Sequence, residues 1–500
     1  MKVAVSNKVM RISDENTIKC GTDSKELMLR AGRGIFKAYG NWGNTCVVCG
    51  TGNNGGDGFV IALAIHENGG NCRIVLVEDK FSEDGRYYFE KCVEKGIEYE
   101  IFSDGTEFSK FDTLADCIFG TGFRGKVSGN VEKCIERMNK SGAYIVSADI
   151  NSGISGDSGL GDISVISDLT VAVQFYKLGH FIGRSKDVMK SKKCIDIGIS
   201  LMGEKVSVPE KADFKDILRE RENNCHKGNF GYTAIIGGCR EYSGAVKLSN
   251  MALSALKSGC GVTKLCVAES VSSYVAPYLL ESTLFVMPDE DGSMIFHKEK
   301  INLLLKGTAA VSCGMGWGNG KDNGKILSYI IENYEGVLII DADGINALSK
   351  LDKNILSRTS CKKIILTPHP LEFSRISGYE TEKILSDPVG SAKEYLKDKN
   401  GKVILLLKGA GTVIAGEKEV FITDTGCAGM ATAGSGDVLS GILTGLMGYC
   451  EPDELSVSCA AYISGLAGEF AQESVGDICM TSSDTVKSIH LAVKELRKGF

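Results

Sequence analysis

Short β-rich runs alternate with helical segments along this chain of 500 residues. Such alternation indicates parallel sheets covered by helices, because a parallel strand pair needs a crossover connection, usually a helix. The predicted strands of the first half are residues 45–49, 73–77, 115–119, 144–148 and 169–173. Those of the second half are residues 233–236, 262–267, 309–312, 337–340, 363–366 and 403–407. The pattern therefore predicts an α/β fold.

The length and a change in composition together predict two domains. Five hundred residues exceed what one hydrophobic core usually organises. Residues 203–224 are rich in charge and show no strand pattern, which is typical of an exposed connector. Because the two halves share an architecture but no motif, we predict two different domains, residues 1–210 and 222–500, and no internal repeat.

The glycine content and the net charge indicate which kinds of binding partner to expect. The chain has 61 glycines, where average usage of roughly 7% would give about 35. They cluster beside apolar runs, where turns approach a ligand closely. The net charge of −6 leaves no basic face for nucleic acid, and no apolar stretch approaches the ~20 residues that span a bilayer. We expect small nucleotides as partners, and neither nucleic acid nor membrane.

Eighteen cysteines lie scattered through the chain, many of them in apolar segments, and no signal-peptide pattern precedes them. We expect reduced thiols in a cytoplasmic protein. Cys46 and Cys49 form a Cys-x-x-Cys pair, but the pair falls in a strand-like run and lacks the second pair of a zinc site. A metal or redox role is the minor alternative.

A glycine-rich segment, residues 50–58, follows the first predicted strand and precedes a predicted helix at residues 59–67. Glycines let the backbone lie against a phosphate, and a helix N-terminus offers it unpaired N–H groups. A tight strand-to-helix connection would explain the glycines alone, but not Asn53, Asn54 and Asp57 among them. Two further strand ends carry polar groups, around Asp116 and Asp149. Carboxyl ends of parallel strands share one edge, so these segments should converge.

With the opening residues 10–32, these segments resemble the YjeF N-terminal domain, a Rossmann-like three-layer domain that epimerises hydrated NADH and NADPH. The likeness spans roughly residues 1–200. It implies nucleotide contacts from Asn53, Asn54, Gly55, Gly56, Asp57, Gly120, Thr121, Gly122, Phe123, Arg124, Gly125, Lys126 and Asp149. It also implies a potassium ion held by oxygen ligands from Asn54, Asp116 and Ser152. Asn151 stands where the family has proline, which exchanges a fixed φ for a flexible turn.

Epimerisation inverts a hydroxyl on the nicotinamide ring carbon next to nitrogen. Proton transfer must help the hydroxyl to leave and must activate the returning water. Asp149 is the predicted acid/base residue, and Asp57 is the second candidate. The alternative for either is a ribose ligand or a loop cap.

A second set of small residues, 429–441, opens an apolar helix near the C-terminus. Backbone N–H groups at its start, with the helix dipole, favour negative charge on a transferred phosphoryl group. Asp437, in the first turn, is the predicted catalytic base toward a hydroxyl. Its alternative role is a helix-start carboxylate worth ~0.3–1 kcal/mol.

Residues 222–495 resemble the dehydratase branch of the ribokinase-like enzymes. The segments that carry the likeness are residues 226–231, 242–245, 313–316, 341–347, 367–372, 408–412 and 429–441, where Ala433 replaces the family glycine. By family position, the hydrate would contact Ala245, Gly316, His369 and Asp437. The adenine nucleotide would contact Lys408, Gly409, Ala410, Gly411, Thr412 and Gly436. Taken singly, His369 could fill a turn, Lys408 could end a strand, and Asp341 and Asp343 could cap strand ends.

Together the two likenesses imply a bifunctional enzyme that repairs hydrated NADH and NADPH. One domain would interconvert the R and S hydrates, and the other would dehydrate the S hydrate with ADP, releasing AMP and phosphate. The sequence does not distinguish ADP from ATP; Mg²⁺ should accompany the nucleotide, and we expect a homo-oligomer. The rivals are a small-molecule kinase, because it shares the fold and anion site, and a nucleotide-sensing or protein-binding N-terminal module without turnover.

Overall fold

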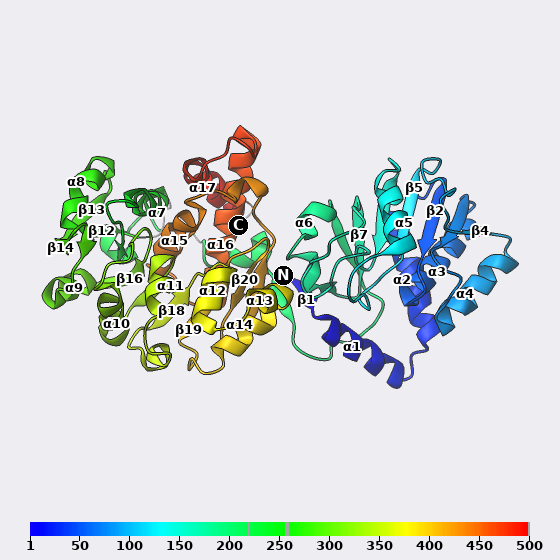
Figure 1. Ribbon diagram of the computed structural model, residues 1–500, viewed down its shortest axis with the longest axis horizontal. Helices are drawn as coiled ribbons and strands as arrows, with labels where there is room; N and C mark the ends of the chain where they lie inside the picture. The colour runs from blue at the N-terminus through cyan, green and yellow to red at the C-terminus, as the bar shows by residue number, and fades with distance from the viewer. Residues whose placement is uncertain (219, 256–259, 499–500) are drawn as a thin grey trace. The chain divides into compact units, whose positions relative to one another are not determined.

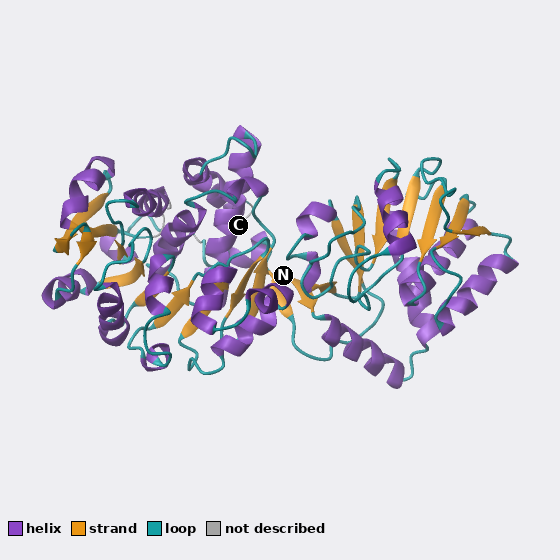
Figure 2. Ribbon diagram, viewed as in Figure 1, coloured by secondary structure: helices purple, strands orange, loops and turns teal. Residues whose placement is uncertain are grey.

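The computed structural model describes residues 1–218, 220–255 and 260–498. It divides into two compact units, Lys2–Val206 and Ser207–Phe500 together with Met1. Both units are α/β, with helices packed on sheets (Figure 1, Figure 2). Among the described residues, no helix has both the length and the apolar character that crossing a membrane requires.

The described N-terminal unit contains a seven-stranded sheet in the order β4-β3-β2-β5-β6-β7-β9, with every pair parallel. Its strands are β2 (Thr45–Cys49), β3 (Cys72–Leu76), β4 (Glu98–Ile101), β5 (Thr113–Cys117), β6 (Tyr144–Ala148), β7 (Leu169–Val173) and β9 (Lys192–Ile195). The predictions for β2, β6 and β7 are confirmed to the residue, whereas β5 begins two residues earlier than expected. The outer strands β4 and β9 were not predicted, because polar residues interrupt their apolar pattern.

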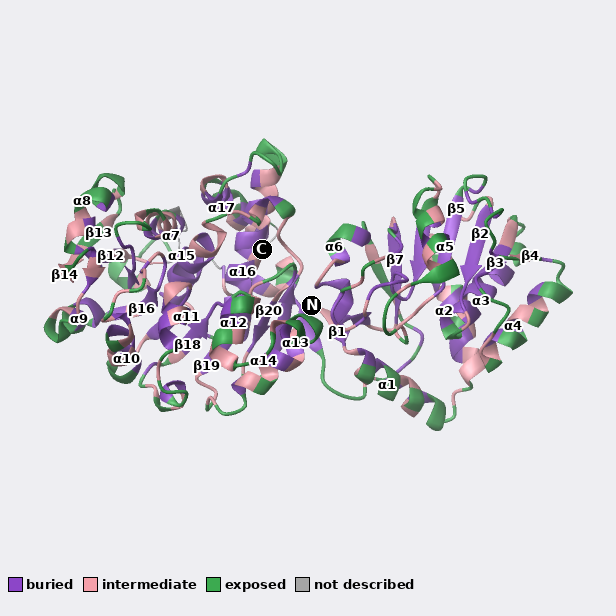
Figure 3. Ribbon diagram, in the orientation of Figure 1, coloured by how far each residue is buried: buried purple, intermediate pink, exposed green. Residues whose placement is uncertain are grey.

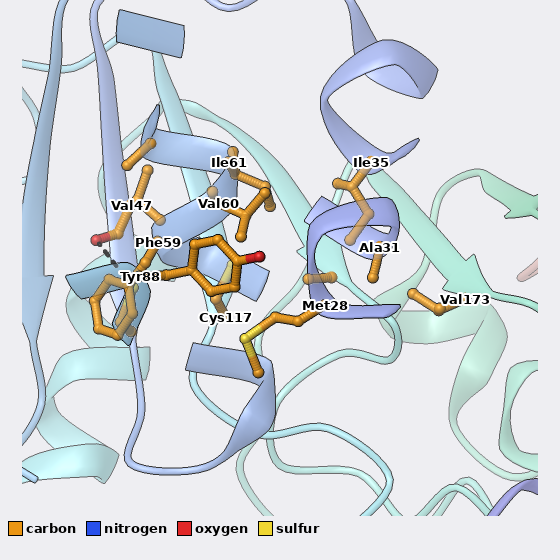
Figure 4. Packing of buried hydrophobic residues seen from close by; sticks show 14 of the residues in the cluster. Met28, Ala31, Ile35, Val47, Phe59, Val60, Ile61, Tyr88, Cys117 and Val173 are labelled. Atoms are coloured by element: carbon orange, nitrogen blue, oxygen red, sulfur yellow. Dashed lines mark hydrogen bonds between the residues drawn. The ribbon is translucent and has the colours of Figure 1, made fainter. Parts of the chain in front are cut away.

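Helices cover both faces of this sheet, as three layers require. One core joins the sheet to α2 (Ser24–Tyr39), α3 (Asn53–Glu67) and α4 (Glu83–Glu94). Figure 4 shows Met28 and Ala31 of α2 and Val60 of α3 among the residues of this core. A second core joins the other face to α5 (Gly129–Asn139). The Rossmann-like three-layer prediction is therefore confirmed, with buried strands between helices (Figure 3).

The strand order indicates at which edge of this sheet a ligand would bind. From β2 the chain builds β3 and β4 on one side, and it then returns to β5 on the other side of β2. Such a reversal opens a crevice at the carboxyl ends of the two strands. The segments after β2, β5 and β6 therefore all reach the same edge.

The helix after β2 begins earlier than predicted, at Asn53 and not at residue 59. Gly55 and Gly58 lie within it, although glycine disfavours helix by about 1 kcal/mol. Packing decides here: a Cβ at Gly55 would meet the Gly50 carbonyl oxygen at 2.1 Å, and one at Gly58 would meet Cys49 Sγ at 2.7 Å. Glycine therefore lets the helix start lie against the strand end.

The C-terminal unit has a sheet in the order β13-β12-β11-β16-β17-β18-β19-β20-β21-β10. In this spatial order, neighbouring strands from β13 through β12, β11, β16, β17 and β18 to β19 are parallel. The β19–β20 and β20–β21 pairs are antiparallel. Their bounds are β11 (Tyr232–Ile236), β12 (Val262–Ala268), β13 (Ser282–Met287), β16 (Thr308–Cys313), β17 (Val337–Ile340), β18 (Lys363–Leu366), β19 (Val403–Leu407), β20 (Thr412–Ala415), β21 (Val420–Thr423) and β10 (Val206–Val208).

Helices α15 (Ser435–Met447), α16 (Glu454–Val475) and α17 (Ser482–Arg497) share one core with this sheet. Helix α7 (Ser243–Ala255) contributes Ala252 to it. The other helices that position the site are α10 (Asn323–Asn333), α11 (Asp343–Leu348) and α12 (Pro370–Ser377). The expected ribokinase-like α/β fold is confirmed by this sheet and by the structural likenesses given below.

The expectation of an exposed, strandless connector at residues 203–224 is wrong in part. Strand β10 is buried and pairs with β21 through Ser207 and Phe421. Phe214 and Leu218 are buried in the core that contains α16 and α17. Apolar residues spaced among the charges supply this burial, so the charge density of the segment concealed its inward-facing positions.

Candidate active sites

Three predicted potassium ligands meet at the carboxyl ends of β5 and β6. The buried Asp116 carboxylate accepts hydrogen bonds from the Ser152 hydroxyl at 2.5 Å and the Ser152 backbone N–H at 2.9 Å. The Ser152 hydroxyl in turn accepts the Phe119 N–H at 2.8 Å, and Asn54 Nδ2 donates to the Phe119 carbonyl at 3.0 Å. Burial raises the pKa of Asp116, while hydrogen bonds from Ser152 oppose the rise.

Asn151 does not loosen the turn as its substitution for proline suggested. It is buried, and its side-chain amide donates to the carbonyls of Val165 at 2.9 Å and Val188 at 2.8 Å. Its amide oxygen accepts the Thr170 hydroxyl at 2.5 Å. Side-chain hydrogen bonds thus replace the proline ring as the restraint on the turn before Ser152.

Asp149 directly follows β6 and has a φ of 63°, a left-handed conformation that is uncommon outside glycine. Such strain costs about 1–3 kcal/mol and persists where surrounding contacts enforce it. Its carboxylate is paired with the ammonium of Lys177, which is 1% exposed, and accepts the Val173 N–H at 3.2 Å. Sequence reasoning missed Lys177; the signal was a single charged residue within the apolar stretch around β7.

His180 completes this corner and was also missed. Its Nδ1 accepts the Lys177 backbone N–H at 2.9 Å, and its Nε2 lies 2.9 Å from the Asp149 carbonyl oxygen. Burial, followed by the Lys177 charge, lowers the pKa of His180 to about 4. The ring is therefore neutral at physiological pH, with Nε2 as the donor.

Asp57 lies in α3 and belongs to the same electrostatic group as Asp149. Burial, followed by the charges of Asp149 and Asp14, raises the pKa of Asp57 well above its ordinary value, against the opposing charge of Lys177. Asp14, on α1 (Asn7–Lys19), has a pKa raised by burial first and by Glu15 next. Asp57 is thus protonated where an isolated aspartate is ionised.

The remaining predicted nucleotide contacts of this unit separate into two groups. Asn54, Gly55 and Gly56 are buried at the start of α3, and a Cβ on Gly120 would lie 3.4 Å from Asn54. Exposed positions include Asn53, Gly122, Arg124, Gly125 and Lys126, while Thr121 and Phe123 are half-buried. Lys126 forms an exposed ion pair with Asp162. The loop after β5 therefore flanks the crevice and is open to solvent.

Cys46 and Cys49 do not face each other. Cys46 is part of the core under α5, whereas Cys49 is part of the core under α2 and α3. Residues three apart on a strand point to opposite faces of a sheet. Their two thiols cannot ligate one metal ion in this fold.

The second site lies at the carboxyl ends of β17, β18 and β19. Lys408 Nζ donates to Asp341 Oδ1 at 2.8 Å and lies 3.8 Å from Glu372 Oε2. Ser440 of α15 donates its hydroxyl to the other Asp341 oxygen at 2.7 Å. Burial opposes the ammonium, but Asp341 and Glu372 dominate and raise the pKa of Lys408. Lys408 is thus a fixed positive charge, and Asp341 does more than cap its strand.

Asp437 lies in the first turn of α15, beside this lysine. The helix is preceded by Gly434 in the left-handed region with φ of 95°. A Cβ on Gly436 would lie 3.3 Å from Lys408 Nζ, so glycine leaves the backbone there open toward the charge. Burial, followed by the charge of Asp341, raises the pKa of Asp437 to about 7, against the opposing charge of Lys408.

Two predicted hydrate contacts come together. Gly316 has φ of 58°, and a Cβ there would lie 3.0 Å from Ala245 Cβ. His369 caps α12: its Nδ1 accepts the Glu372 N–H at 3.3 Å, and Glu372 accepts the His369 N–H at 2.9 Å. The turn-filling role is therefore present, while the His369 side chain stays 46% exposed.

The predicted nucleotide segment after Lys408 forms the β19–β20 hairpin. Gly409 and Ala410 are exposed, Gly411 has φ of 86°, and Thr412 begins β20. The loop thus leaves Lys408 and opens to solvent.

A cavity of about 400 Å³ lies at the amino ends of β11 and β12. It is lined by Arg221, His226, Lys227, Phe230 and Gly261, among others, and by none of the predicted site residues. The described chemistry-bearing groups are at the opposite ends of the strands.

Comparisons with known proteins match both units of the chain. A family model described as NAD(P)H-hydrate dehydratase matches residues 233–490, and one described as YjeF-related protein N-terminus matches residues 24–179. The bifunctional NAD(P)H-hydrate repair enzyme of Thermofilum pendens is 31% identical over 527 residues, which covers 100% of this chain and 98% of that protein. The enzyme of the same name from Escherichia coli is 30% identical over 481 residues, covering 94% and 89%.

Solved structures show likeness of fold. A hypothetical protein of Streptococcus mutans gives a TM-score of 0.52 at 23% identity, covering 58% of this chain and 100% of its own. The ADP/ATP-dependent NAD(P)H-hydrate dehydratase of Bacillus subtilis, co-crystallized with ATP/Mg²⁺, gives 0.50 at 24% identity, covering 58% and 99%.

Proposed function

The chain belongs to the family of bifunctional NAD(P)H-hydrate repair enzymes, and on this premise we propose that it epimerises hydrated NADH and NADPH and dehydrates the S hydrate. We assign epimerisation to residues 1–210 and dehydration to residues 222–500. The observation that carries the proposal is an aspartate near a lysine in each unit, at the carboxyl edge of its sheet. These residues are Asp149 after β6 and Asp437 at the start of α15.

Dehydration begins with transfer of the terminal phosphoryl group of ADP to the ring hydroxyl. Ionised Asp437 accepts the hydroxyl proton, and AMP leaves. Backbone N–H groups from Gly434 to Gly436 stabilise the transferring group, because they precede or open α15 and the helix dipole favours negative charge there. Lys408 supplies a fixed positive charge beside Gly436. Phosphate then leaves the ring carbon with the electron pair of the carbon–oxygen bond, the neighbouring ring carbon gives up a proton to the departing phosphate or to water, and the double bond of the dihydronicotinamide ring is restored.

The polar groups present suit the two expected cations. The Asp116 carboxylate and the Ser152 hydroxyl meet at one strand edge, and the Asn54 amide is hydrogen-bonded to Phe119 beside them. Oxygen ligands of this kind suit a potassium ion. A bound potassium ion would supply positive charge to a nucleotide phosphate at this edge. Magnesium, held mainly by nucleotide phosphates and water, would neutralise charge on the transferred group.

A coupled assay on both epimers tests the proposal. The full chain is incubated with the purified S hydrate of NADH, and separately with the R hydrate, in the presence of ADP, ATP or no nucleotide. We expect the absorbance band of NADH to return from both epimers, and only with nucleotide present. A stable phosphorylated product would support the kinase alternative.

Without nucleotide, we expect each pure epimer to relax to a mixture of both. A chain that dehydrates the S hydrate but leaves the R hydrate unchanged would contradict epimerisation and favour a sensing or protein-binding role for the N-terminal unit. The cytoplasmic location and the homo-oligomeric state stay predictions. Light scattering on the purified chain measures the second.

A further inference from the structure

Lys177 is the most deeply buried charged side chain that the proposed chemistry leaves unexplained. It belongs to β8 (Tyr176–Lys177) and is 1% exposed at its side chain. Its ammonium donates to Asp149 Oδ1 and, at 3.0 Å, to the Val173 carbonyl. A buried ammonium is costly unless it is paired, so the pair with Asp149 offsets the cost of burying this side chain.

The backbone around this pair restricts where the Asp149 carboxylate points. Val173 N–H donates to the same Asp149 oxygen at 3.2 Å, and the neutral His180 ring bridges the Lys177 N–H and the Asp149 carbonyl. The left-handed φ of Asp149 is held by these contacts. The arrangement fixes the direction in which the Asp149 carboxylate points.

Asp57 differs from Asp149 in its pKa. Burial, followed by the charges of Asp149 and Asp14, raises the pKa of Asp57 well above its ordinary value, against the opposing charge of Lys177. Its carboxyl group therefore keeps a proton at pH values where an isolated aspartate is ionised. Such a group is suited to act as the acid of a proton-transfer reaction.

We propose that Lys177 is a positioning residue that holds the Asp149 carboxylate in place as the base of epimerisation, while Asp57 acts as the acid. The inference rests on the proposed epimerase function. It goes beyond that function by separating the roles of two carboxylates and by giving the buried lysine a part in catalysis.

The step balances without an added reactant. Asp57 donates its proton to the ring hydroxyl, the carbon–oxygen bond breaks with its electron pair on oxygen, and the ring nitrogen lone pair stabilises the cation while water departs. Water then adds to the opposite face, its oxygen forms the new bond to carbon, and Asp149 accepts the released proton. Transfer of a proton from Asp149 back to Asp57, directly or through water, restores the starting state.

The test measures epimerisation by the full chain against pH, starting from the pure R hydrate without nucleotide. The titratable groups around Asp149 are Asp14, Asp57, Lys177, His180 and Cys194. For the wild type we expect kcat to fall at high pH as Asp57 loses its proton. For Lys177→Met we expect kcat to fall by about 100-fold or more near neutral pH, and the high-pH limb to move to higher pH, because the Lys177 charge that lowers the pKa of Asp57 is removed.

The matched control is Lys190→Met, which removes another lysine paired with an aspartate in the same unit. Lys190 is 68% exposed and its Nζ lies 2.7 Å from Asp168 Oδ1. We expect the wild-type rate and profile from this variant. A Lys177→Met chain whose rate and high-pH limb match those of the control would overturn the proposal.

Asp57→Asn provides a second test if Lys177→Met does not fold. It replaces a neutral carboxylic acid by a neutral amide, so folding should be retained. We expect a loss of about 100-fold or more in kcat and disappearance of the high-pH limb; an unchanged profile would overturn the proposal. If the wild type itself fails to epimerise, the proposed function falls and not merely the division of roles.

Discussion

Lys408 interacts in different ways with Asp341 and Asp437. Asp341 accepts a hydrogen bond from the Lys408 ammonium at 2.8 Å and another from Ser440 at 2.7 Å. The Lys408 charge lowers the pKa of Asp437, but burial, followed by the charge of Asp341, outweighs it and raises this pKa to about 7. Asp341 is therefore suited to hold the lysine, and Asp437 to exchange a proton near neutral pH.

The first prediction concerns Asp437 itself. We expect Asp437→Asn to lower dehydratase kcat by about 10²–10⁴-fold and to leave epimerisation unchanged, because the base is lost from one unit only. Initial rates of NADH recovery and of epimer exchange measure the two activities. Asp484→Asn is the matched control, since Asp484 also lies in the first turn of a helix, α17. Loss of both activities in a folded Asp437→Asn chain would show that the sites are not separate.

The second prediction follows from the raised pKa of Asp437. A protonated carboxyl cannot accept the hydroxyl proton, so dehydratase kcat/KM should rise with pH and level off above about 7. Rates measured from pH 5 to 9 at saturating ADP give the profile. A rate independent of pH below 7 would exclude Asp437 as the base.

The same pKa predicts a stability difference. The folded chain binds the Asp437 proton more tightly than the unfolded chain does, so ionisation costs stability as pH rises from about 4 toward 7. Asp437→Asn removes this cost. We expect its free energy of unfolding to exceed that of the wild type most at pH 8, and the excess to shrink toward pH 4. An excess that does not depend on pH would contradict the assignment.

At the scale of elements, the backbone at the start of α15 lies next to charged side chains of the candidate site. Gly436 is the second residue of this helix, and a Cβ there would lie 3.3 Å from Lys408 Nζ and 3.7 Å from Asp341 Oδ2. Alanine favours helix over glycine by about 1 kcal/mol. We expect Gly436→Ala to keep the stability of the chain but to raise KM for ADP by about 10-fold, a loss of 1.4 kcal/mol in nucleotide binding.

Gly324→Ala is the matched control, because Gly324 is the second residue of α10 and a Cβ there would meet only Leu351 Cδ2, at 3.4 Å. We expect wild-type KM and equal or greater stability. A Gly436→Ala chain with the KM of this control would show that the start of α15 does not contact the nucleotide. Thermal unfolding reports the stability of both variants.

At the start of α3, in contrast to α15, we predict that replacing a glycine lowers stability. A Cβ at Gly55 would meet the Gly50 carbonyl oxygen at 2.1 Å, and this oxygen belongs to backbone that has little room to shift. We expect Gly55→Ala to destabilise the N-terminal unit by about 1–3 kcal/mol and to reduce epimerisation. Gly105→Ala, with Ser103 Oγ 3.7 Å from its Cβ, is the control. Equal unfolding midpoints would contradict the close packing.

At the scale of the whole molecule, the two units place different site residues at the same kind of position in their sheets. Each places its polar groups at the carboxyl edge of parallel strands, and each unit has a core of its own. If the substrate exchanges between the sites through solution, two defective chains should complement each other. We expect a mixture of Asp149→Asn and Asp437→Asn chains to recover NADH from the R hydrate, whereas either chain alone recovers little. A mixture no better than its components would mean that the sites must share one chain.

The strand pattern and the ordered motifs could be predicted from the sequence because they depend on local properties. Apolar runs such as β2, β17 and β19 are buried on both faces and need no knowledge of their neighbours. The helix start at Asp437 carries its own glycine signal, and the family resemblance rests on linear order. Alternating or charged segments such as β4 and β10 were missed, because half-buried or edge positions depend on what packs there.

Residue types and their order thus determined two α/β folds, and they singled out the glycine-rich loops and the candidate aspartates at the strand ends. Only the tertiary structure decided which aspartate is paired with a lysine. Lys177 is 28 residues from Asp149 in the chain, and Lys408 is 67 from Asp341, yet each pair is in direct contact. Protonation depends on burial and on charges within a few ångströms, and folding creates both across distances that no local pattern records.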